Sequence, residues 1–350
     1  MSTSDTPDSK EGRPQALALV LYGGTSTERD VSLQTGESVL AALEGAALAG
    51  GLEAQVEAVQ IVADGRWSWR DRVLSEEDCI RSLPQNSTVF NALHGGRGEG
   101  GGVQRALEDA GINYTGSGPE ASALCMNKGA ARDVLMSAGL RCAPGALITA
   151  LPTAPQDISE LSAELWALSA EGQGCFVKPN EGGSSAGIHK VSEIQDLIPA
   201  IQHVLDSGEA ALVEAAVSGV ELSVGVLESG HDELIALTPV EVQPRSAGWF
   251  NVVEKYDEEK GALEACPPEN VTAQTVDELK SAALTAHRKT GCHGYSRTDF
   301  IYSEDGQLVV LEVNTLPGLT PRSLLPLEAA TDGMSFPELC LRILKSSRKA

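Results

Sequence analysis

The most informative stretch of the sequence is SRTDFIYSEDGQLVVLEVN, residues 296–314. Two runs of alternating, β-rich residues flank Asp305-Gly306, a pair that is typical of a two-residue hairpin turn. With that turn, Asp299 on the first strand lies directly opposite Glu312 on the second. The stretch therefore predicts two antiparallel strands that carry a pair of facing acids.

The side chains of this hairpin divide between two faces, because successive residues of a strand point to opposite sides. The polar face carries Arg297, Asp299, Glu312 and Asn314. The apolar face, which we expect to join a core, carries Phe300, Tyr302, Val309, Leu311 and Val313.

The two facing carboxylates repel each other and destabilise the hairpin unless a positive charge offsets them. Two acids and an amide oxygen are hard ligands, which suit Mg²⁺ or Mn²⁺ shared with phosphates. The alternative is a solvated surface on which Arg297 neutralises one of the acids. The hairpin alone does not decide between a metal site and this ion pair.

The composition argues against two classes of partner. A net charge of -23 disfavours nucleic acids and acidic membranes, since both require a positive surface. No apolar run approaches the roughly 18 residues of a membrane span, and residues 1–15 are expected to be a disordered tail. Seven scattered cysteines without a CxxC pair are typical of reduced thiols in a cytoplasmic protein.

The order of the elements along the chain predicts three domains. The strands ALALVLYGG (16–24) and STVFNALHGG (87–96) each end in glycines and are followed by a helix, which is typical of a Rossmann-like parallel α/β domain. We expect this domain at 16–116. A central α+β domain is expected at 117–213, and a strand-rich α+β domain that contains the hairpin at 214–350.

Six motifs resemble, in the same order, those of the D-alanine–D-alanine ligases. They are LYGGTSTERDVSLQTG (21–36), ALHGGRGEGG (92–101), YTGSGPEASALCMNK (114–128), VKPNEGGSSAGIHKV (177–191), LVEAAVSGVEL (212–222) and RTDFIYSEDGQLVVLEVNTLPGLTPRSLLP (297–326). The likeness runs from about residue 16 to residue 345, nearly the whole chain. It implies a three-domain ATP-grasp fold with ATP between the central and carboxyl-terminal domains. It also implies that two D-alanines are joined for peptidoglycan synthesis while ATP is split to ADP and phosphate.

The resemblance further implies how ATP and its metal ions are held. It implies that Lys128, Lys178 and Lys255 contact the phosphates of ATP. It implies that Glu214 and Glu221 bind the adenine and the ribose. Without the resemblance, these two residues would be interpreted as solvated acids near strand ends. It also implies that Asp299, Glu312 and Asn314 are ligands of two Mg²⁺ or Mn²⁺ ions.

The amino-acid substrates are expected next to these groups. By the same resemblance, Glu28 binds the ammonium of the first D-alanine, and His94 lies near its carboxyl group. Ser323 and Leu324 receive the carboxylate of the second D-alanine, although Ser323 is equally suited to cap a helix.

Four further residues are implied to act during the reaction. Arg297, assisted by the backbone N–H of Gly318, stabilises the oxyanion and the transferred phosphate. Ser184 and Tyr256 join Glu28 in holding the loops together over the site.

Two loops differ from the usual pattern of this family. Gly100 stands where an acidic residue usually follows the glutamate, although Glu99 itself is present. In the serine-rich loop, Asn180-Glu181-Gly182-Gly183 replaces a segment that often contains an arginine or a leucine. We therefore expect no basic contact from that segment.

The second substrate is left open by the sequence. Ligases that use D-lactate tend to lack the tyrosine of the mobile loop, so Tyr256 favours the dipeptide, while D-serine remains an alternative. An inactive ATP-grasp protein with a regulatory role is disfavoured, because every ligand position that can be placed holds a competent residue. The resemblance is compatible with a homodimer.

Overall fold

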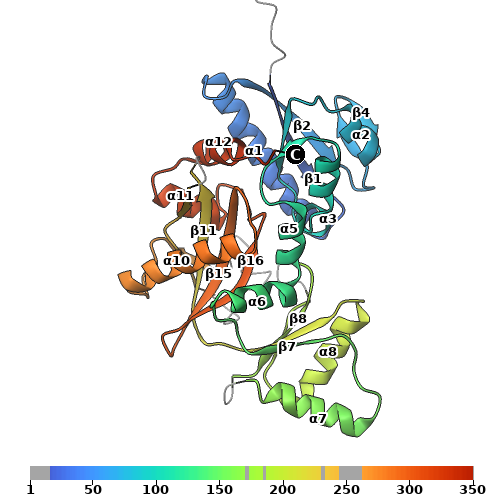
Figure 1. Ribbon diagram of the computed structural model, residues 1–350, viewed down its shortest axis with the longest axis vertical. Helices are drawn as coiled ribbons and strands as arrows, with labels where there is room; N and C mark the ends of the chain where they lie inside the picture. The colour runs from blue at the N-terminus through green and yellow to red at the C-terminus, as the bar shows by residue number, and fades with distance from the viewer. Residues whose placement is uncertain (1–15, 170–172, 184–186, 230–232, 244–261, 350) are drawn as a thin grey trace, which may run out of the picture.

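The computed structural model describes residues 16–169, 173–183, 187–229, 233–243 and 262–349. Its strands form three sheets along the long axis of the molecule, and the third in sequence lies between the first and the second (Figure 1). The first is mostly parallel and the other two are antiparallel, so the expected order of one α/β unit and two α+β units is confirmed. The sheets span residues 16–114, 145–215 and 219–314, whereas the exact domain boundaries stay a prediction.

Three expected site residues lie outside the described residues, namely Ser184, Lys255 and Tyr256. The expected tail at 1–15 lies outside them as well. No helix within the described ranges is long and apolar enough to cross a membrane.

The first sheet has the strand order β4-β3-β2-β1-β5-β6. Its elements are β1 (Ala16–Gly23), α1 (Arg29–Leu48), β2 (Ala54–Ile61), β3 (Trp67–Trp69), β4 (Arg72–Leu74), α2 (Glu76–Ser82), β5 (Ser87–Asn91), α3 (Gly96–Glu99), α4 (Gly102–Asp109) and β6 (Asn113–Tyr114). β1 pairs in parallel with β2 and β5, and β3 and β4 add an antiparallel edge. Because parallel strands end at the same edge, the loops after β1 and β5, which carry Glu28 and His94, lie next to each other.

The second sheet has the order β7-β10-β8-β9. The elements of this region are α5 (Pro119–Met126), α6 (Lys128–Ser137), β7 (Gly145–Ile148), α7 (Pro155–Trp166), β8 (Cys175–Pro179), β9 (His189–Val191), η1 (Ile194–Asp196), α8 (Leu197–Asp206) and β10 (Ala211–Ala215). α7 and α8 pack on one face of the sheet, against Val177 and Val213. The alternation of a strand then directs Lys178 and Glu214 to the opposite face.

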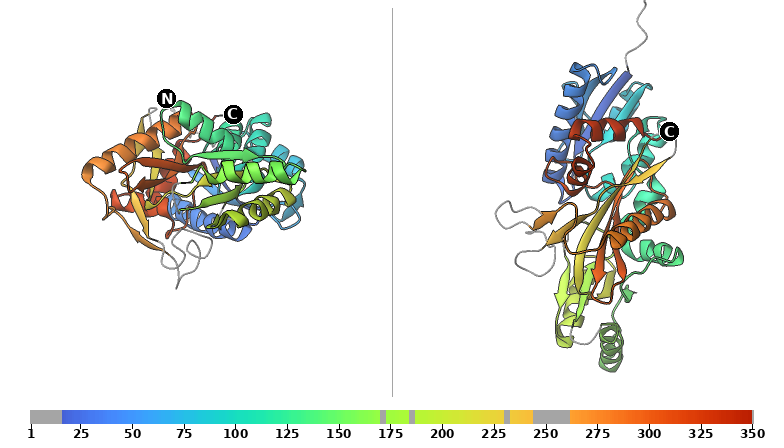
Figure 2. Two further views of the ribbon diagram at one scale, coloured as in Figure 1. Left: turned by 90° about the horizontal axis from the view of Figure 1, so that it is seen from below. Right: turned by 90° about the vertical axis from the view of Figure 1, so that its left-hand side faces the viewer.

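The third sheet has the order β14-β13-β11-β15-β16, with β12 beside β11. Its elements, with the two helices that follow, are β11 (Gly219–Glu228), β12 (Leu234–Ala236), β13 (Val240–Gln243), β14 (Leu263–Ala265), α10 (Ala273–Lys289), β15 (Tyr295–Ser303), β16 (Leu308–Asn314), α11 (Leu324–Thr331) and α12 (Phe336–Lys345). α12 returns to the first sheet, where Leu339 and Ile343 share a core with Val20 and Val39 (Figure 2). The last helix therefore ties the two ends of the chain together.

The hairpin of β15 and β16 differs from the prediction at its turn. The loop has three residues, because Ser303 N donates to Gln307 O at 2.9 Å and Gly306 adopts a φ of 77°. A bulge between Asp299 and Phe300 then restores the expected pairing of Asp299 with Glu312.

The bulge also changes which side chains reach the core. Val310, rather than Val309 or Leu311, packs with Phe300 and Val313. The expectation that Leu311 belongs to the core is wrong, since Leu311 lines the ligand pocket described next. The extra residue in β16 shifts the register and turns this side chain towards the polar face.

Candidate active site

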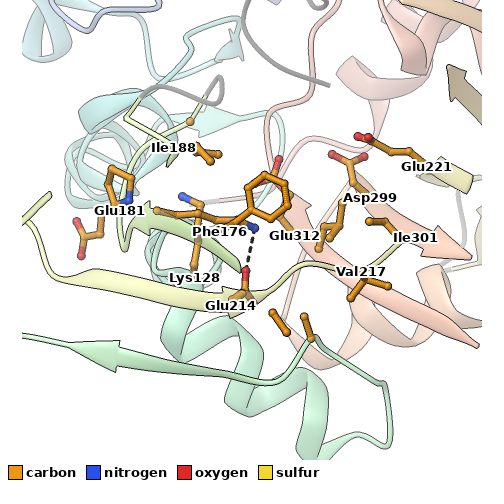
Figure 3. Close-up of a pocket in the computed structure, with 16 residues that line it drawn as sticks. Lys128, Phe176, Glu181, Ile188, Glu214, Val217, Glu221, Asp299, Ile301 and Glu312 are labelled. Atoms are coloured by element: carbon orange, nitrogen blue, oxygen red, sulfur yellow. Dashed lines mark hydrogen bonds and ion pairs between the residues drawn. The ribbon is translucent and has the colours of Figure 1, made fainter. Parts of the chain in front are cut away.

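A pocket lies between the second and third sheets (Figure 3). Six residues that the sequence singled out line it, namely Lys128, Lys178, Glu214, Glu221, Asp299 and Glu312. Its apolar wall consists of Phe176, Ile188, Val217, Ile301 and Leu311. The pocket thus combines charged groups from two sheets with an apolar surface.

Lys178 and Arg132 both bind the carboxylate of Glu214. Lys178 Nζ lies 2.8 Å from Oε2, and Arg132 Nη1 lies 2.6 Å from Oε1. Burial alone would raise the pKa of Glu214, but the two cations outweigh it and hold that pKa below its ordinary value. Burial also opposes the charge of Lys178, yet Glu214 raises its pKa. Glu214 and Lys178 are therefore both charged at neutral pH. A contact from Glu214 to adenine or ribose stays a prediction.

Lys128 begins α6 and reaches over the glycine-rich loop, where its Nζ donates to Gly182 O at 2.6 Å. Asn180 holds the start of this helix. Its carbonyl oxygen accepts from Lys128 N at 3.0 Å, and its Oδ1 accepts from Gly129 N at 2.9 Å. Burial lowers the pKa of Lys128. Asn180 therefore positions Lys128 without adding a charge to the loop.

Asp299 is the centre of the polar face of the hairpin. Arg297 donates to it through Nε and Nη2, each at 2.9 Å. Asn314 Nδ2 donates at 3.0 Å, and Ser223 Oγ of β11 donates at 2.5 Å. Burial opposes the charge of Arg297, yet Asp299 raises its pKa. The ion pair considered as an alternative is present, but both side chains are only 13% exposed, so they do not form a solvated surface.

This face also has the donor chemistry of a divalent-cation site. Glu312 lies opposite Asp299 and lines the same pocket, and Asn314 supplies an amide oxygen from the next position on that face. Mg²⁺ and Mn²⁺ prefer such oxygen donors. The described residues contain no group of three or more His, Cys, Asp or Glu that could hold a metal. A metal here would need phosphate oxygens to complete its ligand set.

Glu28 lies where three loops meet. It immediately precedes α1, at the end of the loop that follows β1. A Cβ at Gly95, after β5, would lie 2.4 Å from Glu28 Oε2, and a Cβ at Gly183 would lie 3.0 Å from the same oxygen. The carboxylate therefore touches both the loop of the first sheet and the serine-rich loop of the second. The implied contact with Ser184 itself lies outside the described residues.

His94 is buried between α1 and the loop that follows β16. Its Nε2 lies 2.9 Å from Thr35 Oγ1, and the ring also hydrogen-bonds the backbone of Leu316. Burial lowers the pKa of His94 to about 4, so that the imidazole is neutral at pH 7. The side chain thus links two segments of the site, and its contact with a substrate carboxyl stays a prediction.

Gly318, Ser323 and Leu324 lie together at the start of α11. A Cβ at Gly318 would lie 2.9 Å from Ser323 Oγ. Ser323 occupies the N-cap position, but its hydroxyl makes no capping bond and accepts instead from Thr320 N at 3.1 Å. The side chain of Leu324 is buried with Val240 in a small core, so its group closest to a ligand would be its backbone N–H. A helix N-terminus of this kind favours a carboxylate.

Glu99 lies at the end of α3, near the carboxylates of Glu28 and Glu312. Its Oε2 accepts from Gly95 N at 3.0 Å. Burial, and then the negative charges of Glu28 and Glu312, raise the pKa of Glu99 to about 7, while Arg297 opposes the shift. The protonation of Glu99 therefore depends on the charges of both Glu28 and Glu312.

Sequence reasoning missed three buried residues that hold the site, namely Thr35, Arg132 and Ser223. The spacing of each residue from a predicted site residue could have indicated that it lies near the site. Arg132 follows Lys128 by one helical turn, and Thr35 lies on the helix that begins beside Glu28. Ser223 shares a strand face with Glu221.

Known proteins of one family match this chain. Residues 138–345 match the family model described as D-ala D-ala ligase C-terminus. A D-alanine--D-alanine ligase of Nitratidesulfovibrio vulgaris (strain DP4) is 37% identical over 330 residues, which cover 93% of this chain and 96% of that protein.

Solved structures agree with this match. The VanG D-Ala:D-Ser ligase from Enterococcus faecalis aligns with a TM-score of 0.77 at 28% identity, covering 95% of this chain and 99% of that one. The D-alanine--D-alanine ligase from Bacillus anthracis complexed with ATP aligns with a TM-score of 0.74 at 25% identity, covering 95% and 97% of the two chains. With most of both chains aligned and with the same family model matched, this chain belongs to the D-alanine–D-alanine ligase family.

Proposed function

We propose that this protein joins two D-alanines into D-alanyl-D-alanine for peptidoglycan synthesis, while ATP is split to ADP and phosphate. The observation that carries the proposal is the convergence of Lys128 and Lys178 with the facing pair Asp299 and Glu312 in one pocket. Membership of the ligase family supports the same reaction.

ATP is proposed to bind in this pocket, with its base against the apolar wall and its phosphates towards Lys128 and Lys178. Phosphoryl transfer requires mainly positioning and neutralisation of charge. Both lysines already have fixed positions, because Lys178 is held by Glu214 and Lys128 by the carbonyl of Gly182. Lys255 is proposed to add a third contact, and Glu221 to bind the ribose.

Asp299, Glu312 and Asn314 would hold one or two Mg²⁺ or Mn²⁺ ions. When bound, such ions neutralise charge on the phosphate oxygens. Arg297 orients Asp299 through two hydrogen bonds, so that the carboxylate is fixed before any ligand binds.

The reaction has two steps in this proposal. The carboxylate of the first D-alanine attacks the γ-phosphorus of ATP; a P–O bond forms, the bond to ADP breaks, and D-alanyl phosphate results. The amine of the second D-alanine then attacks the carbonyl carbon of that acyl phosphate. The tetrahedral oxyanion collapses, phosphate leaves, and the nitrogen loses a proton. Arg297 and the backbone N–H of Gly318 are proposed to stabilise the oxyanion.

The two amino acids are proposed to bind at the edges of the pocket. Glu28 pairs with the ammonium of the first D-alanine, next to His94, and Ser184 and Tyr256 close the loops over it. The carboxylate of the second D-alanine binds at the start of α11, on the hydroxyl of Ser323 and the backbone N–H of Leu324. This position uses the partial positive charge of a helix N-terminus.

D-Serine is the second candidate for the second substrate, because the VanG D-Ala:D-Ser ligase is a structural neighbour. The test is phosphate release from ATP and Mg²⁺ with D-alanine alone and with D-alanine, D-serine and D-lactate together, followed by mass analysis of the products. We expect D-alanyl-D-alanine to dominate. A rate no higher than that without amino acid would refute the ligase, and a dominant mixed product would refute the dipeptide.

One variant refines this test. Tyr256→Phe should let D-lactate compete at neutral pH, whereas undetectable use of D-lactate would locate the specificity elsewhere.

We also propose that the protein acts in the cytoplasm, which its seven unpaired cysteines support. The homodimer stays a prediction that sedimentation velocity would check.

A further inference from the structure

Two cysteines lie close together outside the ligand pocket. Cys125 Sγ, near the end of α5, lies 4.0 Å from Cys292 Sγ, in the loop between α10 and β15. The two segments pack directly, since His293 N of this loop donates to Ser117 Oγ at 3.1 Å. A Cβ at Gly291 would also lie 3.8 Å from the Cβ of Ala121 on α5. A disulfide has an S–S distance of about 2.05 Å, so the sulfurs must approach by roughly 2 Å to bond.

Hydroxyl groups surround the sulfur of Cys292. The hydroxyls of Ser117 and Ser296 hydrogen-bond it. Thr290 Oγ1 also lies 3.2 Å from it, although this hydroxyl donates to Ala286 O at 2.8 Å. Hydrogen bonds to the charged form stabilise a thiolate, which is the form that reacts with peroxides. The bond from the Cys125 thiol and then these hydroxyls lower the pKa of Cys292 against the effect of burial.

A buried histidine orients one of these hydroxyls. His287 Nδ1 lies 2.7 Å from Ser296 Oγ, and burial lowers the pKa of His287 to about 4, so that the ring is neutral. In the tautomer with the proton on Nδ1, the ring donates to Ser296 Oγ. The hydroxyl proton of Ser296 is then directed to Cys292.

Other cysteines have different surroundings. Cys266 is partly exposed like Cys292, but its Sγ faces two carbonyl oxygens, those of Thr238 at 3.6 Å and Pro239 at 3.5 Å, and a single hydroxyl, that of Thr331, hydrogen-bonds it. Burial raises the pKa of Cys266, and it raises that of Cys142 to about 11. These two thiols are therefore controls within the same chain.

We propose that Cys125 and Cys292 are a reversible oxidation site, at which a hydroperoxide converts the two thiols to a disulfide. The Cys292 thiolate attacks one peroxide oxygen; an S–O bond forms, the O–O bond breaks, and water leaves after protonation of the departing oxygen. The Cys125 sulfur then attacks the sulfenic acid of Cys292. An S–S bond forms, the S–O bond breaks, and a second water leaves. In total, two thiols and hydrogen peroxide give one disulfide and two waters.

The disulfide would constrain both sides of the ligand pocket. Cys125 shortly precedes Lys128 in the sequence, and Cys292 shortly precedes Arg297. A shift of about 1 Å in a site can cost on the order of 10²-fold in rate. We expect oxidation to lower kcat/KM for ATP by up to about 100-fold, and dithiothreitol to restore it. This effect on kinetics rests on the proposed ligase function, whereas formation of the disulfide does not.

Peptide mapping of the full-length protein tests the site. The protein is treated with hydrogen peroxide, its remaining thiols are alkylated, and it is digested without reductant. We expect a cross-linked peptide that contains Cys125 and Cys292 and disappears with dithiothreitol, while Cys142 and Cys266 are alkylated. The proposal is overturned if Cys125 and Cys292 remain alkylated after peroxide, or if Cys142 and Cys266 oxidise at the same rate.

Variants separate the two chemical steps. Cys125→Ser should leave a sulfenic acid on Cys292 that dimedone traps, and Ser296→Ala should slow its formation. Cys292→Ser should keep its rate of phosphate release through peroxide treatment, whereas Cys266→Ser, the matched control, should lose it as the unaltered protein does. A disulfide that leaves the ATP kinetics unchanged would refute the effect on the pocket. A chain without ligase activity would refute the proposed function but leave the mapping result intact.

Discussion

Replacing Glu214 with Gln tests the ion network at the base of the ligand pocket. The carboxylate of Glu214 accepts from Lys178 at 2.8 Å and from Arg132 at 2.6 Å. The three side chains are 7%, 15% and 10% exposed, respectively. Glutamine has the same shape but no charge, and its amide nitrogen would face one of the two cations. The variant therefore leaves two buried positive charges without a counter-ion.

The magnitude follows from the burial of the network. Removing one partner of a buried ion pair costs about 3–5 kcal/mol, because the remaining charge is uncompensated. Since glutamine keeps one acceptor oxygen, we expect the lower end, ~3 kcal/mol. For a chain of 350 residues, an unfolding entropy of about 2.1 cal/mol/K per residue gives about 1.4 °C per kcal/mol, so Tm should fall by roughly 4 °C. The KM for ATP should also rise, since Lys178 loses the group that fixes it.

Differential scanning calorimetry measures the loss, and Glu120→Gln is the matched control. Glu120 forms an ion pair with Arg105, but the two side chains are 71% and 50% exposed. An exposed pair contributes about 0–1 kcal/mol, so the control should change Tm little. The comparison applies the same chemical change to a buried and an exposed glutamate.

The pH dependence provides a second check. The folded pKa of Glu214 is lowered, so its contribution to stability is present above its ordinary pKa of about 4.3 and is lost as the pH falls. The difference in Tm between the unaltered protein and Glu214→Gln should therefore shrink below that pH. If Glu214→Gln is no less stable than Glu120→Gln while its KM for ATP rises, the reasoning is refuted and Glu214 acts only as a ligand contact.

Other substitutions test the remaining parts of the site. Glu312→Gln should abolish phosphate release by removing a proposed metal ligand; an unchanged Mg²⁺ dependence would refute the assignment. Gly95→Ala should destabilise the protein by about 1–3 kcal/mol, since a φ of 64° with a ψ of 176° lies in a region that essentially only glycine adopts. It should also raise the KM for D-alanine, because the new Cβ would lie 2.4 Å from Glu28 Oε2, and steady-state kinetics with an unaltered KM would contradict this role of Glu28. Asn180→Ala should lower the unfolding free energy by about 1–3 kcal/mol by leaving Gly129 N–H without its acceptor, and calorimetry that shows no change would contradict it.

The alternation of strand residues was sufficient to predict which face of the hairpin is polar. Arg297, Asp299, Glu312 and Asn314 share that face because the period of a strand is two, and the structure pairs Asp299 with Glu312 as expected. The same period separates Val177 in the core from Lys178 in the pocket. Local patterns of this kind require no knowledge of the rest of the fold.

The turn of the hairpin shows where local patterns become insufficient. Asp305-Gly306 suits a two-residue turn, but glycine at φ 77° also suits the last position of a three-residue turn. The structure has the longer turn, and the extra residue is offset by the bulge that moves Leu311 to the pocket. The pairing of Asp299 with Glu312 was predicted correctly because these two one-residue changes cancel. Packing of the complete sheet, and not the turn sequence, selects this register.

Contacts between segments that are distant in the sequence could not be predicted from it. The motifs contain Lys178 and Glu214, but no local pattern indicates that they bind each other, or that Arg132 completes the network. His94 likewise could not be linked to Thr35 from spacing alone, since the contact depends on how α1 packs beside β5. These partners come from distant segments, so only the assembled fold brings them together.

The charges of the assembled pocket give a physical reason for ATP to bind together with metal ions. Five acids, Glu181, Glu214, Glu221, Asp299 and Glu312, line the pocket with two cations, Lys128 and Lys178, while Arg132 and Arg297 pair with two of these acids from beside it. A triphosphate adds several negative charges to a set that already has one more acid than it has cations, and an uncompensated charge in a buried site is costly. Lys178 cannot supply the whole compensation, because any phosphate must share it with Glu214. Divalent cations on the facing pair Asp299 and Glu312 would restore the balance, and they would do so where those two carboxylates otherwise repel each other.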